Sequence, residues 1–90
     1  MQFTKEQFAL INVALQTNEK KELRTFPLAE QKDALSIYDK LIVHVDEGKM
    51  FTEGEEEFTT TEKALILKLL DREWDVQILK TVFSIKELLA

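Results

Sequence analysis

The sequence has 90 residues, of which 44% are hydrophobic and 32% charged, with a net charge of −5 at pH 7 and no cysteine. These values are typical of one globular domain, and we expect a single helical domain over residues 1–90. The absence of cysteine excludes disulfides, thiolate metal sites and cysteine nucleophiles, and it suits a cytoplasmic protein. No apolar run has the length or the flanking charges of a membrane span or an export signal, so neither is expected.

The first predicted helix begins after Thr4. The Thr4 hydroxyl and the Gln7 side chain have the spacing of a capping box, in which each side chain bonds the backbone of the other residue. Phe3 and Phe8 have the spacing of a hydrophobic staple across the same helix start. The helix is expected to fade near Thr17, and the mostly charged residues that follow form either one more exposed turn of helix or a polar connector.

The clearest helical pattern follows Pro27, which suits the first turn of a helix because it lacks an N–H and has a helical φ. Thr25 or Phe26 is expected to cap this helix, and Gly48 to follow its end near Glu47 in a left-handed conformation. Apolar residues recur along this helix every seven positions. Further apolar residues between them form, together with the first set, a broad band on one side of the helix that we expect to face the core. The band consists of Leu28, Ala34, Leu35, Ile37, Tyr38, Leu41, Ile42 and Val45.

Residues 49–58 show neither helical nor alternating periodicity and are predicted to be a loop. The negative charge of the chain is concentrated around this loop. Residues 46–62 carry seven acidic side chains and one lysine, whereas the chain before them is neutral and the chain after them has a charge of +1. An acidic balance disfavours binding to nucleic acid and favours a protein partner with a basic surface.

A second capping box, Thr59 with Glu62, predicts the start of a third helix whose first turns are apolar on most of their circumference. The pattern weakens beyond Trp74. The β-branched residues there would suit a strand, but their spacing favours helix, which either continues or breaks near residues 81–84 before a short terminal helix over residues 85–90. The predicted fold is therefore all-α, a small three- or four-helix bundle with an acidic loop between helices 2 and 3.

Neither a metal site nor catalysis is predicted from the polar residues. An EF-hand loop starting at Asp46 would need an oxygen ligand where the chain has Gly48 or Met50, and a glycine where it has Phe51. His44 is the only histidine and cannot form a metal site alone; we expect it at a helix C-terminus, where a positive imidazole complements the helix dipole. No phosphate-binding loop or nucleophile motif is present, so we expect no enzyme, no metal and no cofactor.

Two groups of residues are candidate contacts with a protein partner. The first combines acidic side chains with flanking aromatic rings, which is the chemistry of a binding hot spot with electrostatic steering, unless both rings fold back onto the bundle instead. The second pairs Arg72 with Trp74, two residue types that are enriched at hot spots, although we favour the alternative that Trp74 closes the edge of the bundle over Leu70 and Ile78. The first group consists of Phe51, Glu53, Glu55, Glu56, Glu57 and Phe58.

These observations predict a small acidic protein-binding module that acts as a regulator, adaptor or inhibitor. Two alternatives stay open. The chain could be a self-associating structural homodimer, in which residues 65–70 and 78–89 are buried between copies. The acidic side chains could instead imitate DNA phosphates and block a nucleic-acid-binding protein.

Overall fold

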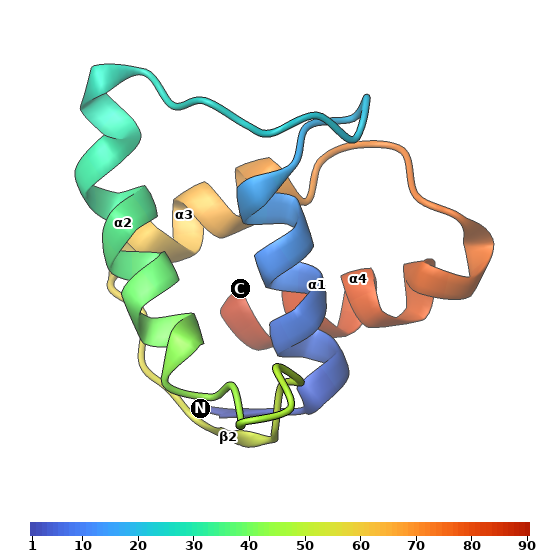
Figure 1. Cartoon of the computed structure of the whole chain (residues 1–90). Helices are drawn as coiled ribbons and strands as arrows, with labels where there is room; N and C mark the ends of the chain where they lie inside the picture. Colours follow the sequence, from blue (N-terminus) through green and yellow to red (C-terminus); the bar gives the residue numbers. More distant parts are fainter.

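Four helices and one short antiparallel sheet make up the chain in the computed structural model, which describes all 90 residues (Figure 1). In chain order the elements are β1 (Gln2–Phe3), α1 (Lys5–Gln16), α2 (Leu28–Ile42), β2 (Gly54–Glu55), α3 (Thr60–Leu69) and α4 (Val76–Leu89). The mostly helical fold predicted from the sequence is confirmed, whereas the sheet was not predicted. None of the four helices combines the length and the apolar character that crossing a bilayer requires.

The hydrophobic core lies between α1 and α3, each of which contacts all the other helices. In Figure 1, α1 and α2 stand side by side, and α3 and α4 lie across them. The apolar segments that suggested a homodimer are largely used inside the single chain: α3 buries Leu65, Ile66 and Leu69, and α4 buries Val82 and Ile85. That argument for self-association is therefore corrected, because these side chains fill the core of one copy.

The start of α1 agrees with the sequence analysis in detail. The Gln7 backbone N–H donates to the Thr4 hydroxyl over 3.1 Å, and the Thr4 N–H donates to the Gln7 side chain over 2.9 Å. The rings of Phe3 and Phe8 stack with their centroids 5.0 Å apart, as the staple spacing predicts. Because Phe3 belongs to β1, which pairs with Gly54 of β2, the staple also ties the acidic segment to α1.

The connector between α1 and α2 is not helical. Thr17 and Leu23 form an isolated antiparallel bridge around a turn in which Lys21 has a φ of 63°. The Arg24 side chain donates from Nε to the backbone oxygens of Ala14 and Thr17, which are among the carbonyls that α1 leaves without a partner at its C-terminus. Of the two alternatives from the sequence, the polar connector is therefore the one observed.

Both ends of α2 differ from the prediction. Pro27 occupies the cap position itself, with no side-chain capping bond, so neither Thr25 nor Phe26 caps the helix. The helix ends at Ile42, before the predicted Glu47. Beyond it the chain turns back through an antiparallel bridge between Val45 and Phe51, and the residue in a left-handed conformation is Lys49 (φ 62°), while Gly48 has no positive φ.

The break in the C-terminal third lies earlier than predicted. α3 ends at Leu69, α4 begins at Val76, and the polar segment between them makes the turn. Ser84 lies inside α4 and donates its hydroxyl to the Thr81 carbonyl, so it does not begin a terminal helix. The predicted break at residues 81–84 is wrong because a single continuous helix buries its apolar face against α1 and α3.

Candidate functional site

The surface of α2 carries a row of exposed apolar side chains at heptad spacing. Leu28 is 85% exposed, Leu35 61%, Tyr38 40% and Ile42 44%. We call these four residues the α2 stripe. The sequence analysis placed them in the core-facing band, and this is wrong: α2 turns its other apolar residues, Ala34, Ile37 and Leu41, toward the core and leaves the stripe uncovered.

A shallow groove of about 440 Å³ runs beside the stripe, between α2, the end of α1 and the connector. Six of its nine lining residues are hydrophobic, among them Leu35 and Tyr38 of the stripe. The connector supplies Phe26, which packs against the core, and Leu23, which is 82% exposed and stands at the groove. Three exposed apolar side chains, those of Leu23, Leu35 and Tyr38, therefore surround one depression of the surface, a feature typical of interaction sites.

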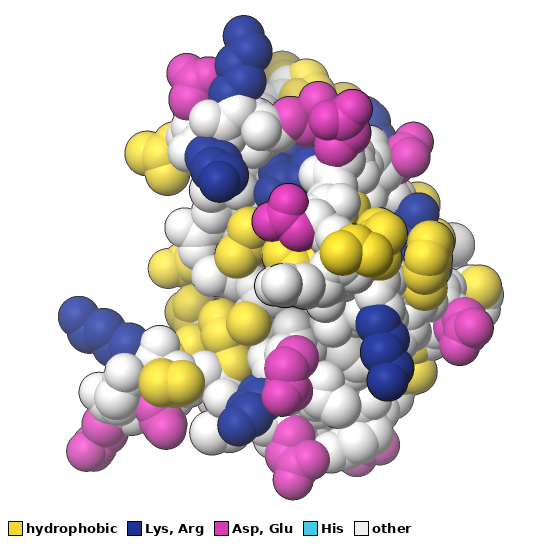
Figure 2. All heavy atoms as spheres, turned by 90° about the vertical axis from the view of Figure 1, so that its right-hand side faces the viewer, with side chains coloured by type: hydrophobic (Ala, Val, Ile, Leu, Met, Phe, Trp, Pro, Cys, Tyr) yellow, Lys and Arg dark blue, Asp and Glu magenta, His cyan; other side chains and the backbone are white.

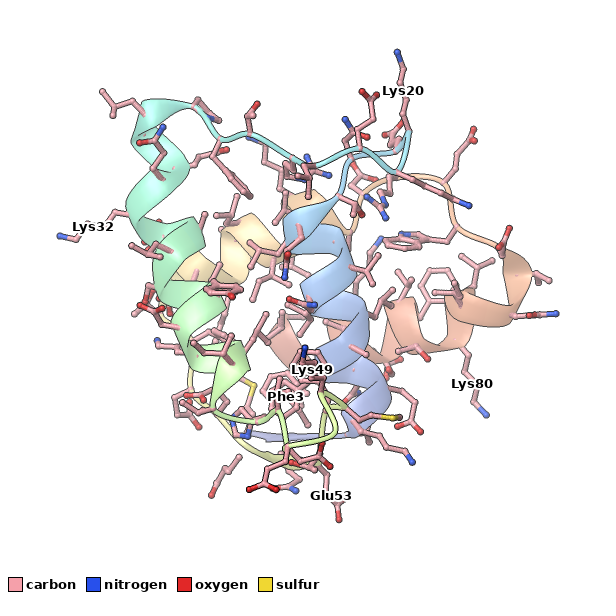
Figure 3. All side chains as sticks on the ribbon, viewed as in Figure 1. Phe3, Lys20, Lys32, Lys49, Glu53 and Lys80 are labelled. Atoms are coloured by element: carbon pink, nitrogen blue, oxygen red, sulfur yellow. The ribbon has the colours of Figure 1, made fainter.

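Some charged side chains of α2 are bonded to other residues of the chain, and others are not. Glu30 and Lys40 form ion pairs with side chains of α3, and Asp33 accepts a hydrogen bond from the same helix. Lys32 and Asp39 have neither an ion pair nor a side-chain hydrogen bond, and both are exposed. Figure 3 shows Lys32 pointing away from the body of the molecule. These two unpaired charges have opposite signs and lie seven residues apart along the edge of the stripe.

Two of the four glutamates in the predicted acidic patch are bonded within the chain. Glu56 accepts a hydrogen bond from His44 Nε2 over 2.9 Å, and Glu57 contacts the amino group of Met1. That amino group, by its hydrogen bond and its charge, lowers the pKa of Glu57 below the usual value. Glu62, which the sequence placed only as a capping residue, is 2% exposed and pairs with Lys40.

The two aromatic rings predicted to edge this patch do not form an exposed rim. Phe58 is 5% exposed and meets Phe3 edge-to-face at 5.6 Å, and Phe51 packs against the core near Phe8. Glu53, Glu55 and Glu57 are exposed at the surface, and Figure 3 shows Glu53 pointing outward at the end of the molecule opposite the connector. Of these three, Glu53 and Glu55 make no side-chain bond within the chain, and a role for them in partner binding stays a prediction.

His44 has a packing role that the sequence did not indicate. Its ring lies on Phe8 with centroids 4.3 Å apart and an interplanar angle of 15°. It lies two residues beyond the last residue of α2 and not in its final turn. No group of three or more histidine and carboxylate side chains converges on a point where a metal ion could bind.

Gly54→Ala is expected to destabilise the protein by about 2 kcal/mol. A Cβ atom at Gly54 would lie 2.7 Å from His44 Nδ1 and 2.9 Å from its Cε1, and the stacking on Phe8 prevents the ring from moving away. Gly48→Ala is the matched control, because its Cβ would meet only the Asp46 carboxylate at 3.3 Å. Urea unfolding followed by circular dichroism measures both; equal losses in the two variants would contradict the packing described here.

The second predicted contact pair, Arg72 with Trp74, closes an edge of the fold. The Trp74 indole N–H donates to the Leu70 carbonyl over 2.9 Å, and the Arg72 guanidinium lies 4.1 Å from the centre of the indole ring while donating to the Thr17 carbonyl. Burial, followed by the positive charge of Arg24, lowers the pKa of Arg72 below its usual value. Trp74 therefore closes the edge of the fold over Leu70, which is the alternative that the sequence favoured.

The side of the molecule formed by α4 is a weaker candidate for an interface. Figure 2 turns this side toward the viewer and shows hydrophobic patches interspersed with charged side chains. Its exposed apolar residues include Val76 and Phe83, and Lys86 lies over the Phe83 ring at 5.9 Å. Val76 and Phe83 lie seven residues apart, but they form a single pair and not a longer row like the α2 stripe.

Comparisons with known protein families, curated proteins and solved structures found no match to this chain. The proposals below therefore rest on the geometry of its surfaces.

Proposed function

We propose that the protein is a small protein-binding module, acting as a regulator, adaptor or inhibitor, and that its contact surface is the α2 stripe with the groove beside it. The observation that carries this proposal is the exposure of four large side chains at heptad spacing on one helix. Water contact with such side chains costs about 25 cal/mol for each Å² of apolar surface, so a chain gains free energy when a partner covers them. Contiguous exposed patches of this kind mark interfaces more often than chance.

The shape of the surface favours an amphipathic helix as its occupant. α2 has 15 residues and is therefore about 22 Å long. The spacing of Leu28, Leu35 and Ile42 is that of one seam of a helix pair, in which side chains of each helix fit between those of the other. A groove lined by Leu35 and Tyr38 accepts such side chains in the manner of other helix-in-groove interactions.

The exposed carboxylates have a secondary role in this proposal. Glu53 and Glu55 steer a basic partner surface toward the protein and contribute little binding energy, because exposed charges are screened by salt. Imitation of DNA is the less favoured alternative, since Glu56 and Glu57 are occupied by bonds within the chain. We place the protein in the cytoplasm because of its cysteine-free composition, and we assign it no catalytic activity.

Leu35→Glu is expected to weaken partner binding about 100-fold, because the new charge would be buried against an apolar helix. The measurement is affinity capture from host lysate at low and high salt, with identification of each captured protein by mass spectrometry. Leu35 is 61% exposed, so the substitution leaves the core intact and far-UV circular dichroism is expected to be unchanged. The same partner is expected at both salt concentrations with the unmodified protein.

Two matched variants separate this surface from the others. Val76→Glu places a charge on a side chain that is 79% exposed at the start of α4, and it is expected to retain the partner. Reversal of Glu53 and Glu55 to lysine tests the acidic end of the molecule. Capture that is lost in the lysine variant and at high salt, but kept in Leu35→Glu, would reject the α2 stripe and favour the acidic patch or DNA imitation.

A further inference from the structure

We propose that the helix which covers the α2 stripe belongs to a second copy of this chain, so that two copies of α2 pack antiparallel around a twofold axis. This inference rests on the proposed function, because it names the occupant of the same surface. In an antiparallel pair centred between residues 35 and 38, Leu35 of each copy lies against Tyr38 of the other. Leu28 and Ile42 of each copy extend the apolar seam to its two ends. α2 is itself an amphipathic helix of the kind that the surface accepts, so α2 of a second copy can cover it.

The unpaired charges of α2 complement each other only in this orientation. Lys32 and Asp39 occupy equivalent heptad positions, four residues after Leu28 and Leu35. In an antiparallel pair such positions face each other, so Lys32 of one copy lies beside Asp39 of its partner, and the twofold axis repeats the contact. A parallel pair would set these two side chains against Pro27, Ala34 or Leu41 and would leave both charges without a partner.

The distribution of charge along the whole chain favours the same orientation. The acidic segment, residues 46–62, has a charge of −6 and lies at the C-terminal end of α2, whereas the connector, residues 18–27, has a charge of +1 and lies at the N-terminal end (Figure 1). An antiparallel pair places the acidic segment of each copy near the connector of the other. A parallel pair would bring two segments of −6 together, which costs free energy at low salt.

The accessible surface of the chain is larger than a single copy of this mass normally exposes. It amounts to 6199 Å², whereas a monomeric protein of 10.5 kDa is expected to expose about 5,400 Å². The excess is about 800 Å², which equals the share of one partner in a standard protein–protein interface. The exposed stripe and the protruding Leu23 contribute to this excess, and an α2 pair would cover them.

Analytical ultracentrifugation over a concentration series tests the proposal. The unmodified chain is expected to change from the monomer mass of 10.5 kDa toward twice that value as its concentration rises. Leu35→Glu is expected to weaken dimerisation at least about 100-fold, and Val76→Glu to leave it unchanged. A persistent monomer mass for the unmodified chain at all concentrations overturns the proposal, and so does a dimer that Leu35→Glu leaves intact.

A charge exchange tests the orientation and does not depend on how Leu35→Glu folds. In a dimer of either variant, Lys32→Glu or Asp39→Lys, residue 32 of each copy faces a like charge at residue 39 of the other, so both symmetric contacts become repulsive. Each variant is expected to weaken the dimer about tenfold. When the two variants are mixed, the contacts between unlike chains become attractive again, and a heterodimer of near-normal affinity is expected. Failure of the mixture to recover dimerisation overturns the antiparallel arrangement.

The two proposals fail in different ways. If the chain stays monomeric while Leu35→Glu still loses an identified partner, the second copy is rejected as the occupant and the α2 stripe remains the contact surface. If the chain stays monomeric and Leu35→Glu captures the same partners as the unmodified chain, both proposals are rejected. Capture of only the chain itself, lost with Leu35→Glu, is the result that both proposals expect.

Discussion

Phe8→Ala is expected to lower the free energy of unfolding by about 4 kcal/mol. The Phe8 side chain is 0% exposed and lies between two rings, Phe3 with centroids 5.0 Å away and His44 at 4.3 Å. Truncation to alanine removes these contacts and leaves a cavity that the surrounding rings cannot fill without breaking the β1–β2 pairing or the His44–Glu56 bond. A chain of this length has a total stability of roughly 5 to 13 kcal/mol, so the loss is a large share of it.

Urea unfolding monitored by the fluorescence of Trp74 and by circular dichroism measures this effect. Phe83→Ala is the matched control, since Phe83 is 57% exposed and its truncation is expected to cost less than about 1 kcal/mol. Phe8→Ala is also expected to loosen the acidic end of the molecule, because His44 and Phe51 both pack against this ring. Similar losses in the two variants would show that the aromatic cluster does not hold the fold together.

The starts of α1 and α3 could be predicted because their signals are local. The capping boxes at Thr4 and Thr59 involve residues three apart, and both are present in the structure with the predicted partners. The stacking of Phe3 on Phe8 is equally local. Such short-range bonds depend on neighbouring residues only, which is why these two could be placed from the sequence, whereas Ser84 lies inside α4 because packing of that helix overrides the local signal.

The direction in which α2 faces could not be predicted in this way. Its apolar residues cover more than half of the helix circumference, and two overlapping rows, one through Leu35 and one through Ile37, satisfy the spacing of a buried face. Only the contacts of α2 with α1 and α3 decide between them. Charge misleads here, because Glu30 and Lys40 lie on the side of the helix away from Leu35 and yet face α3, with which they form ion pairs.

The early end of α2 and the small sheet depend on residues far apart in the chain. His44 leaves the helix to stack on Phe8, 36 positions earlier, and β1 pairs with a strand more than fifty residues away. A two-residue strand has no periodicity to detect. The same folding-back of the chain explains why Phe58, predicted at an exposed rim, is buried beside Phe3.

Lys40→Met is expected to destabilise the protein by about 3 kcal/mol at pH 7, because it leaves the Glu62 carboxylate buried without its positive partner. Lys40 Nζ lies 2.6 Å from Glu62 Oε1, and the Thr59 N–H donates to the same oxygen over 2.8 Å. Burial acts to raise the pKa of Glu62, but the hydrogen bonds from Lys40, Ser36 and the Thr59 backbone outweigh it and hold the pKa below its usual value. The ionised form of Glu62 is thus the one that the folded protein prefers.

The sign of the pH dependence follows from these opposing effects. In the unmodified protein, the stabilisation from Glu62 is present above the pKa of the unfolded chain and is lost as the pH falls through the lower pKa of the folded state. Lys40→Met removes the hydrogen bond and the charge of Lys40, two of the causes that lower the pKa of Glu62, so protonation of Glu62 costs the folded variant less than it costs the unmodified protein. The difference in unfolding free energy between the two proteins is therefore expected to be largest near pH 7 and to shrink as the pH falls below about 4.5.

Glu62→Gln provides the control for this prediction, because it removes the titrating group and its amide oxygen can still accept from the Thr59 N–H. In the Glu62→Gln background, Lys40→Met is expected to cost less than about 1 kcal/mol and to show no pH dependence near the pKa of a carboxyl group. Urea unfolding of the four proteins between pH 4 and pH 7 completes the double-mutant cycle. An equal cost of Lys40→Met in both backgrounds would show that Lys40 stabilises α2 by packing alone and that the buried ion pair contributes nothing.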